Sequence, residues 1–224
     1  MPIARAGGPV ILVLLLLHLI FLTAAWLVGG WPATGALSSI LTVLSVLFAL
    51  LTLFGIFFFR DPERNVPQGD GLVVSPADGR VLGVEEVEET EYIAEPTSRV
   101  SIFMSLFDVH VNRFPVSGVV RYKSYRPGKF FNASLDKASL DNESMALGIE
   151  SAGSVKVLVI QIAGLIARRI ICSVEQGQSL KQGQRFGMVC FGSRLEVYLP
   201  RAARWQVAAG DRVVAGESIL ATLP

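Results

Sequence analysis

Charged side chains are scarce in this chain and nearly absent from its first quarter. Only 17% of the 224 residues are Asp, Glu, Lys or Arg, whereas an ordinary soluble domain carries about 25%. Residues 1–59 contain one of them, Arg5, so the remaining 165 residues hold 19 basic and 19 acidic side chains. This neutral body lacks the basic surface that displaces counterions from nucleic acids, and we therefore expect no nucleic-acid partner.

Cysteine, histidine and nucleotide-binding motifs are also few or missing. Two cysteines do not form a disulfide framework, so they leave the redox compartment open. One of the two histidines, His18, lies in an apolar run, which argues against a histidine-based zinc site, and we expect no metal. Neither G-x-x-x-x-G-K-[ST] nor a strand-linked G-x-G-x-x-G occurs, so the common nucleotide-binding loops are excluded as well.

The long uncharged run predicts two membrane-spanning helices. Residues 6–59 contain no ionised side chain, and as one helix they would extend about 80 Å, far beyond a hydrocarbon core of about 30 Å. Two glycines, a tryptophan and a proline at 29–32 break the run. The spans are then expected at 10–28 and 36–58, so that residues 1–59 form a helical hairpin. A cleaved signal peptide is the alternative for the first span, but a second full span follows at once.

The positions of lysine and arginine predict the orientation of this hairpin. Arg5 precedes the first span, Arg60 and Arg64 follow the second, and the turn between the spans contains neither residue type. Because cytoplasmic flanks carry the excess of Lys and Arg, both ends of the hairpin are expected in the cytoplasm. The protein is thus expected in the cell membrane, with residues 60–224 forming a domain on the cytoplasmic side.

The pattern of residues 60–224 predicts a mostly β domain. Short runs rich in β-branched residues are separated by Gly and Pro at a spacing typical of a sandwich or barrel. The runs are 72–75, 79–84, 100–104, 118–122, 155–162, 168–173 and 195–199.

An internal repeat refines this prediction. The pattern V-x-x-G-x-x-[LV]-x-x-G occurs at 174–183 and again at 207–216, an offset of 33 residues. It predicts a turn, a short strand and another turn, with glycines where the backbone needs positive φ. It resembles the turns of biotinyl/lipoyl-like barrels, in which two similar halves pack as a flattened sandwich; chance spacing of glycines is the alternative. The expected fold is therefore a transmembrane helical hairpin followed by a barrel-sandwich β domain.

Two polar residues of the β domain are candidates for chemistry. His110 is flanked by Asp108, Asn112 and Arg113, a polar density unusual for a strand core, which makes it a candidate acid or base. Asp78 lies in S-P-A-D-G, a sequence that by itself is most often only a turn. Neither residue alone carries a functional hypothesis.

A set of motifs in a fixed order indicates a family. The motifs are F-R-D-P-x-R-x-x-P at 59–67, S-P-A-D-G at 75–79, F-D-V-H-V-N-R at 107–113, K-F-x-N-A at 129–133, D-K at 136–137, N-E at 142–143, Q-I-A-G-x-x-A-R-R-I at 161–170 and F-G-S at 191–193. Together they resemble the short form of the phosphatidylserine decarboxylases, from about residue 59 to the C-terminus. Each motif is weak alone, but their shared order makes coincidence improbable.

The resemblance implies a proenzyme that cuts itself between Gly192 and Ser193. Glycine suits this bond, because it obstructs the attack of the Ser193 hydroxyl on the preceding carbonyl least. The ester so formed is cleaved by β-elimination, and loss of ammonia from the resulting dehydroalanine leaves a pyruvoyl group on residue 193. Residues 1–192 become the β chain and 193–224 the α chain of a heterodimer.

The resemblance also implies the reaction and the roles of further residues. The lyase forms a Schiff base between its pyruvoyl cofactor and the amine of phosphatidylserine, and releases CO2 and phosphatidylethanolamine. We assign His110 as the base toward Ser193, oriented by Asp78, and expect it to protonate the carbanion later. Longer members carry a second histidine where Arg113 stands and usually a threonine where Arg194 stands. Either one histidine serves both stages here, or one stage uses another group.

Three cations and the membrane hairpin complete the predicted site. Arg168, Arg169 and Lys129 are candidates for binding the phosphodiester or carboxylate of the membrane phospholipid, with a solvated face as the alternative. The hairpin would hold the site where a two-chain lipid lies. A homo-oligomer is compatible with the resemblance.

A membrane-anchored barrel-sandwich adaptor, or a carrier-like protein without catalysis, is the alternative function. Such adaptors place a long helical hairpin between two half-motifs, and the 33-residue offset leaves no room for one. A carrier would present a modifiable lysine between small or methionine residues at a hairpin tip, and neither repeat contains a lysine in that setting. The sequence therefore favours the enzyme.

Overall fold

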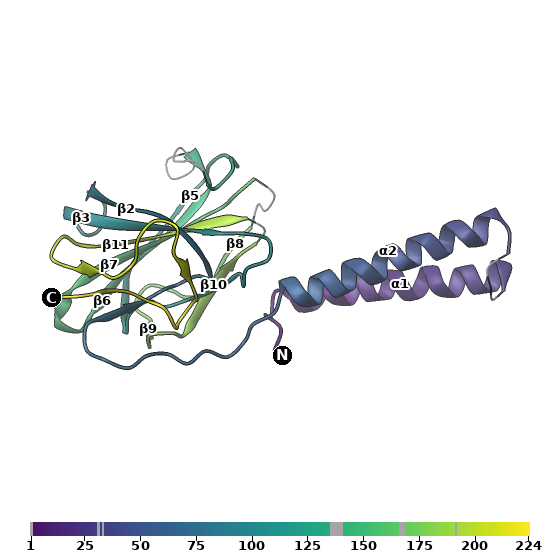
Figure 1. Cartoon of the computed structure of the whole chain (residues 1–224), viewed down its shortest axis with the longest axis horizontal. Helices are drawn as coiled ribbons and strands as arrows, with labels where there is room; N and C mark the ends of the chain where they lie inside the picture. Colours follow the sequence, from purple (N-terminus) through teal and green to yellow (C-terminus); the bar gives the residue numbers. More distant parts are fainter. Residues whose placement is uncertain (1, 31, 33, 135–140, 166–168, 191) are drawn as a thin grey trace. The chain divides into compact units, whose positions relative to one another are not determined.

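The protein is described by a computed structural model that covers the chain except residues 1, 31, 33, 135–140, 166–168 and 191. The chain consists of two compact units, Met1–Pro62 and Glu63–Pro224. Figure 1 shows that the first, the helical unit, contains two long helices and that the second, the β unit, contains the strands. The predicted combination of two apolar helices with a mostly β domain is confirmed.

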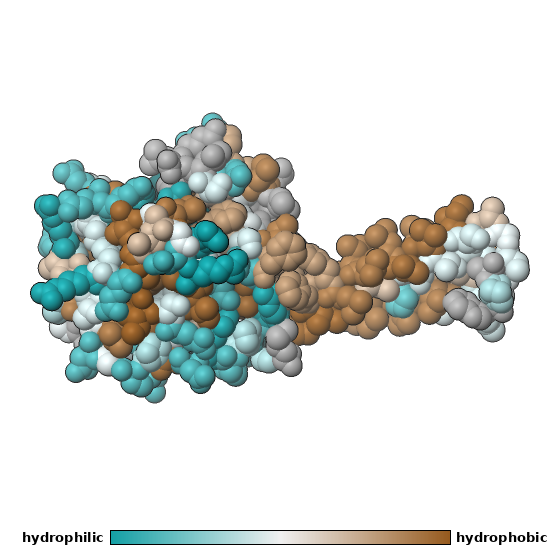
Figure 2. Space-filling model, in the orientation of Figure 1, coloured by the Kyte–Doolittle hydropathy of each residue, from teal (hydrophilic) through white to brown (hydrophobic). Residues whose placement is uncertain are grey.

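The helical unit is a pair of packed helices, α1 (Gly7–Gly29) and α2 (Ala36–Phe58). Both are long and apolar enough to cross a membrane. Each contains its predicted span, and Figure 2 shows apolar side chains along the exposed surface of the pair. The buried residues of α2 include Ser38, Ser45 and Thr52, small side chains at a seven-residue spacing. They let the helix backbones approach closely, as is typical of helix pairs in membranes.

His18 is used in this helix contact. Its Nδ1 atom lies 3.0 Å from the carbonyl oxygen of Ser45 and 2.9 Å from the Ser45 hydroxyl. The ring is therefore a polar link between α1 and α2, since polar side chains inside spanning helices pair with one another or with backbone carbonyls.

The β unit contains fourteen described strands in three sheets. The strands are β1 (Leu72–Val74), β2 (Gly79–Glu89), β3 (Glu95–Met104), β4 (Val111–Arg113), β5 (Gly118–Arg126), β6 (Ser144–Ser151), β7 (Lys156–Ile162), β8 (Ile170–Cys172), β9 (Ser179–Leu180), β10 (Arg185–Val189), β11 (Ser193–Pro200), β12 (Arg204–Trp205), β13 (Arg212–Val213) and β14 (Ile219–Thr222), with a short 3₁₀ turn, Ala152–Ser154, before β7. The sheet orders are β13-β2-β3-β11-β7-β6-β5-β9, β4-β10-β8 and β1-β14-β12. None of these sheets of described strands closes into a barrel.

Strand β11 is central to the largest sheet and carries the predicted cleavage site at its first residue. It pairs antiparallel with β3, where Ser193 faces Met104, and with β7, where Arg194 faces Ile162. Its residues are buried on both faces from Ser193 to Leu199. Because side chains alternate along a strand, Ser193 and Leu195 point to one face of the sheet and Arg194 to the other. The first face packs in the main apolar core with residues of β3, β7 and β10.

The internal repeat adopts the predicted turn–strand–turn conformation in both copies. The four glycines of the repeat have positive φ, with values of +89°, +76°, +94° and +75° for Gly177, Gly183, Gly210 and Gly216. The short strands between them are β9 and β13. The two copies also meet, because a Cβ atom on Gly216 would lie 3.7 Å from the Cα of Gly183. The repeat is thus a structural one.

Candidate active site

The Gly192–Ser193 bond lies at the N-terminal end of β11, in the β unit. Gly192 has a φ of +67°, in the left-handed region where a side chain would be strained. Ser193 is completely buried, and its hydroxyl lies 3.4 Å from the sulfur of Met104 on β3. A thioether is a weak hydrogen-bond acceptor, so this hydroxyl is held in largely apolar surroundings next to a glycine whose backbone conformation other residues rarely adopt.

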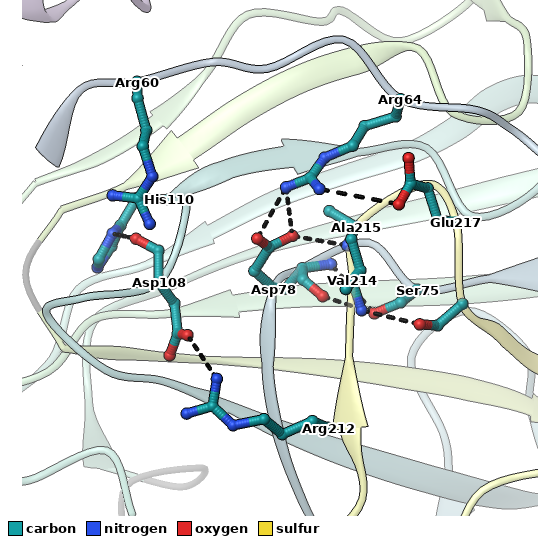
Figure 3. Close-up of polar contacts among 12 residues, drawn as sticks. Arg60, Arg64, Ser75, Asp78, Asp108, His110, Arg212, Val214, Ala215 and Glu217 are labelled. Carbon is teal, nitrogen blue, oxygen red and sulfur yellow. Dashed lines mark hydrogen bonds and ion pairs between the residues drawn. The ribbon is translucent and has the colours of Figure 1, made fainter. Parts of the chain in front are cut away.

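His110 lies between β3 and β4 and is also completely buried. Its Nδ1 atom is 2.9 Å from the main-chain carbonyl oxygen of Asp108 (Figure 3). A carbonyl oxygen only accepts hydrogen bonds, so Nδ1 carries the proton in this contact. In the neutral imidazole the other nitrogen, Nε2, is then the basic one. The chain thus fixes a histidine in the tautomer that a general base at Nε2 requires.

The turn that orients His110 is itself held by hydrogen bonds. The Asp108 carboxylate accepts from the Ser105 main-chain N–H at 2.8 Å and from the Ser105 hydroxyl at 2.7 Å. Arg212 approaches the other carboxylate oxygen at 3.8 Å (Figure 3). The sequence singled out Asp108 only as a polar neighbour, and nothing in the pattern showed that its main-chain oxygen orients the ring.

Asp78 lies among different partners from those predicted. Arg64 Nη2 is 2.9 and 2.8 Å from its two carboxylate oxygens, and the Ala215 N–H donates to it at 2.7 Å (Figure 3). Among the described residues no hydrogen bond joins Asp78 to His110. Burial raises the pKa of Asp78 by more than the Ala215 N–H and the Arg64 guanidinium lower it. The predicted orienting role of Asp78 remains a prediction.

His110 and Ser193 are both completely buried, and no described hydrogen bond joins them. Val111, the residue after His110, faces Met188 in the pairing of β4 with β10. Strand β10 then leads within a few residues to Ser193. The sequence order of the motifs could not show the pairing of β4 with β10, because it joins strands far apart in the chain.

A chain of buried polar contacts, which sequence reasoning missed, leads away from Ser193. The sulfur of Met104, which faces the Ser193 hydroxyl, also lies 3.8 Å from the Asn112 side-chain nitrogen. The Asn112 side-chain oxygen accepts a 2.8 Å hydrogen bond from Gln161 on β7. Oε1 of Gln161 is buried and finds no hydrogen-bond partner among the described residues. Both amides belong to motifs noted in the sequence, but nothing there predicted that they meet.

Cys190, close to the candidate bond, is not suited to act as the nucleophile. It is buried, and burial raises the pKa of its thiol, with Arg169 as a smaller opposing influence. The thiolate is the reactive form of cysteine, so this thiol stays neutral and inert near neutral pH. Ser193 is the better candidate.

Two of the three predicted substrate-binding cations can be placed. Lys129 and Arg169 are exposed, and the Lys129 ammonium lies 5.7 Å from the centre of the Phe131 ring. The main-chain oxygen of Arg169 accepts a 3.3 Å hydrogen bond from Cys190, which ties it to the segment leading into the candidate bond. Arg168 lies outside the described residues.

Arg113 and Arg194, where this sequence departs from the longer proteins that it resembles, both have structural partners. Arg113 is buried and donates a 3.0 Å hydrogen bond to the Gly183 carbonyl oxygen. Arg194 is buried on the opposite face from Ser193. Its guanidinium lies 2.9 Å from the Glu196 carboxylate and 2.6 Å from the Ser101 hydroxyl. Neither arginine reaches Ser193 in these contacts.

Comparison with known proteins agrees with the motifs. Residues 51–221 match the family model described as phosphatidylserine decarboxylase. A phosphatidylserine decarboxylase proenzyme of Oleidesulfovibrio alaskensis is 52% identical over 178 residues, covering 80% of this chain and 81% of the relative. Proenzymes with the same description from Syntrophus aciditrophicus and Symbiobacterium thermophilum are 45% and 48% identical, and cover 98% and 87% of this chain and 97% and 94% of their own length.

Proposed function

Because the chain belongs to the phosphatidylserine decarboxylase family, we propose that it activates itself by cutting the Gly192–Ser193 bond and then carries a pyruvoyl group on residue 193. The enzyme is a carboxy-lyase of phospholipid biosynthesis that converts phosphatidylserine to phosphatidylethanolamine and CO2. The adaptor without catalysis is therefore set aside. The observation that carries the proposal is a buried serine hydroxyl directly after a glycine of positive φ.

Self-cleavage uses the Ser193 hydroxyl as the nucleophile. Its oxygen bonds to the carbonyl carbon of Gly192 while the peptide C–N bond breaks, which gives an ester and a free amine. Loss of the proton on the Ser193 Cα then expels the Gly192 carboxylate. This elimination leaves a dehydroalanine at residue 193. Water then replaces its amino group, ammonia leaves, and the ketone remains.

His110 is the base that we assign to these proton transfers. The Asp108 carbonyl oxygen holds Nδ1, so Nε2 is the nitrogen that accepts a proton. The same nitrogen, once protonated, can return a proton at the carbon from which CO2 has left. One histidine thus suffices for both stages if its ring remains in place after the cut.

The burial of residue 193 supports a ketone at this position. Hydrolysis alone would leave a charged α-ammonium group at a completely buried site beside Met104. An isolated buried charge is costly, whereas a neutral ketone of nearly the same size is not. When present, the pyruvoyl group supplies the carbonyl that takes up the substrate amine and accepts the electron pair released with CO2.

The exposed cations and the helices serve the lipid substrate. Arg169 offers charge for the phosphodiester next to the segment that leads to the cleaved bond, and Lys129 is a second exposed cation. We assign Arg168 to the same task from its place in the motif. The helices α1 and α2 anchor the enzyme in the membrane with the β unit in the cytoplasm, so that the lipid need not leave the bilayer.

After cleavage the two chains stay together through strand pairing. The α chain, 193–224, contributes β11, β12, β13 and β14, and β11 lies between β3 and β7 of the β chain. We also propose that the two repeat copies, which meet at Gly183 and Gly216, are the half-motifs of a barrel-sandwich fold. Separation of the chains would expose the core face of β11.

Intact-mass analysis of the purified full chain tests the proposal. The wild type should yield two pieces, 1–192 and 193–224, the smaller without a free α-amino group. Ser193→Ala should remain one chain of 24.2 kDa without decarboxylase activity. Ser179→Ala, at an exposed serine of β9, should be cut like the wild type. An uncut wild-type chain that still decarboxylates phosphatidylserine would refute the mechanism.

A further inference from the structure

The end of β7 lies against the carbonyl group of the bond that we propose is cut. The pairing of β11 with β7 places Arg194 opposite Ile162, and two residues further along this register Gly192 lies opposite Gly164. The approach is very close, because a Cβ atom on Gly164 would overlap the Gly192 carbonyl oxygen and lie 2.8 Å from its carbon. Only glycine leaves room for the carbonyl in its present position.

Asn142 fixes the segment that contains Gly164. It is completely buried, and its side-chain nitrogen donates 2.8 Å hydrogen bonds to the carbonyl oxygens of Ala163 and Phe131. Its side-chain oxygen accepts a third, from the Phe131 N–H at 2.8 Å. The Ala163 N–H donates to the Glu143 carbonyl at 2.9 Å. Ala163 is therefore held on both sides, and Gly164 follows it directly.

From these contacts we propose that Gly164 and Asn142 are positioning residues for self-cleavage. Gly164 forms the surface against which the Gly192 carbonyl packs, and Asn142 holds the segment that contains Gly164 in place. The inference rests on the proposed cleavage at Gly192–Ser193 and adds the residues that prepare the bond for attack. A carbonyl packed against a fixed backbone cannot turn away as the Ser193 oxygen approaches. Holding reacting atoms in such a geometry contributes several powers of ten to a rate.

A purely structural role for Gly164 makes a different prediction, and Gly118 on β5 provides the matched control. A Cβ atom on Gly118 would overlap the Glu150 carbonyl oxygen, so Gly118→Ala disturbs a strand carbonyl in the same way. That carbonyl belongs to the pairing of β5 with β6, which does not include β11. If both glycines matter only for folding, both alanine variants should lose stability and cleavage in parallel.

The experiment follows cleavage of newly made full-length chain in detergent by intact mass, together with its thermal unfolding. Gly164→Ala should be cut about 100-fold more slowly than the wild type, since a displacement of about 1 Å can cost that factor. Asn142→Asp, which loses both donors to Ala163 and Phe131, should also be slowed. Gly118→Ala should be cut at the wild-type rate even where its unfolding temperature falls as far.

Hydroxylamine distinguishes the step that fails, because it cleaves an ester but not a peptide. If Gly164 positions the carbonyl for the first attack, no ester forms in Gly164→Ala and hydroxylamine releases no fragment. The inference is overturned if folded Gly164→Ala and Asn142→Asp are cut at the wild-type rate, if Gly118→Ala is slowed equally, or if hydroxylamine frees both pieces from Gly164→Ala. Should Gly164→Ala not fold, Asn142→Asp decides. A wild-type chain that is never cut would instead refute the proposed function.

Discussion

The guanidinium of Arg64 holds Asp78 through one nitrogen, Nη2, which lies 2.9 and 2.8 Å from the two carboxylate oxygens. Asp78 also accepts the Ala215 N–H, and Glu217 accepts the Asn65 N–H at 2.9 Å. Arg64, Asn65 and Asp78 belong to the proposed β chain, whereas Ala215 and Glu217 belong to the α chain. In the uncut chain Asp78 is therefore part of a contact that ties the two future chains together.

Arg64→Met should destabilise the β unit in a pH-dependent way. Near neutral pH it leaves the Asp78 carboxylate, with 15% of its side chain exposed, charged without its ion-pair partner, and we expect a loss of about 3 kcal/mol in unfolding free energy. Burial already raises the folded-state pKa of Asp78, and loss of Arg64 raises it further. Protonated Asp78 needs no counter-ion, so the deficit should shrink as the pH falls through this pKa.

Chemical unfolding of the full chain in detergent at pH 4 to 8 measures this effect. Arg201→Met is the control, because it breaks an ion pair with Glu86 in which both side chains are about two-thirds exposed. Such an exposed pair contributes little to stability, so the unfolding free energy of the control should equal that of the wild type at every pH. A deficit of Arg64→Met that is constant over this range would contradict the assignment to Asp78.

His110→Gln should block self-cleavage, while Asp108→Asn should permit it. Glutamine offers no basic nitrogen, and loss of a general base costs about 10² to 10⁴ in rate. The oxygen that orients His110 belongs to the Asp108 main chain, so it is retained in Asp108→Asn. The fraction of uncut chain over time, read by mass, gives both rates. If Asp108→Asn were as slow as His110→Gln, the carboxylate rather than the main chain would orient the ring.

Arg194→Met should lower the unfolding free energy more than the same substitution of an exposed arginine, and a second substitution should restore most of the loss. Arg194 and Glu196 are 2% and 1% exposed, so removal of the arginine weakens the compensation of a buried carboxylate and should cost about 3 to 5 kcal/mol. Arg99 still approaches Glu196 at 3.5 Å, which favours the lower figure. Arg194→Met with Glu196→Leu should recover most of the loss in a double-mutant cycle of unfolding free energies. No recovery would mean that packing, and not charge, explains the effect.

The sequence predicted what depends on local pattern and missed what depends on long-range pairing. The absence of charge located both helices, and the repeat located the positive-φ glycines, because apolar periodicity and turn chemistry are local. Strands β6 and β10 were missed, although they flank the site. The partner of Asp78 was missed as well: Arg64 is 14 residues away in the sequence, and only the fold brings the two together. That Arg194 points away from Ser193 could have been predicted, since neighbours on a strand face opposite sides.

Substitutions of the buried amides Asn112 and Gln161 should lower the unfolding free energy by different amounts. The number of unsatisfied polar atoms that each substitution leaves predicts the order. In the wild type Gln161 Oε1 already lacks a partner among the described residues, while its nitrogen donates to Asn112. Gln161→Met removes that unsatisfied atom but leaves the Asn112 oxygen without its donor, so one unsatisfied atom replaces another and about 1 kcal/mol is lost with the hydrogen bond.

Asn112→Leu is the more costly change, because it removes the partner of the Gln161 side-chain nitrogen while Oε1 still lacks one, so that two buried polar atoms are unsatisfied in place of one. Each buried unsatisfied group costs about 1 to 3 kcal/mol, so this variant should lose at least twice as much unfolding free energy as Gln161→Met. The double variant buries neither amide and should be more stable than Asn112→Leu alone. Unfolding of the four chains in detergent tests the order, with Gln176→Met, at an exposed glutamine bonded to the Arg121 carbonyl, as a nearly neutral control. If Gln161→Met proved the more damaging single change, its Oε1 would have to bind a group that the contacts of the described residues do not include.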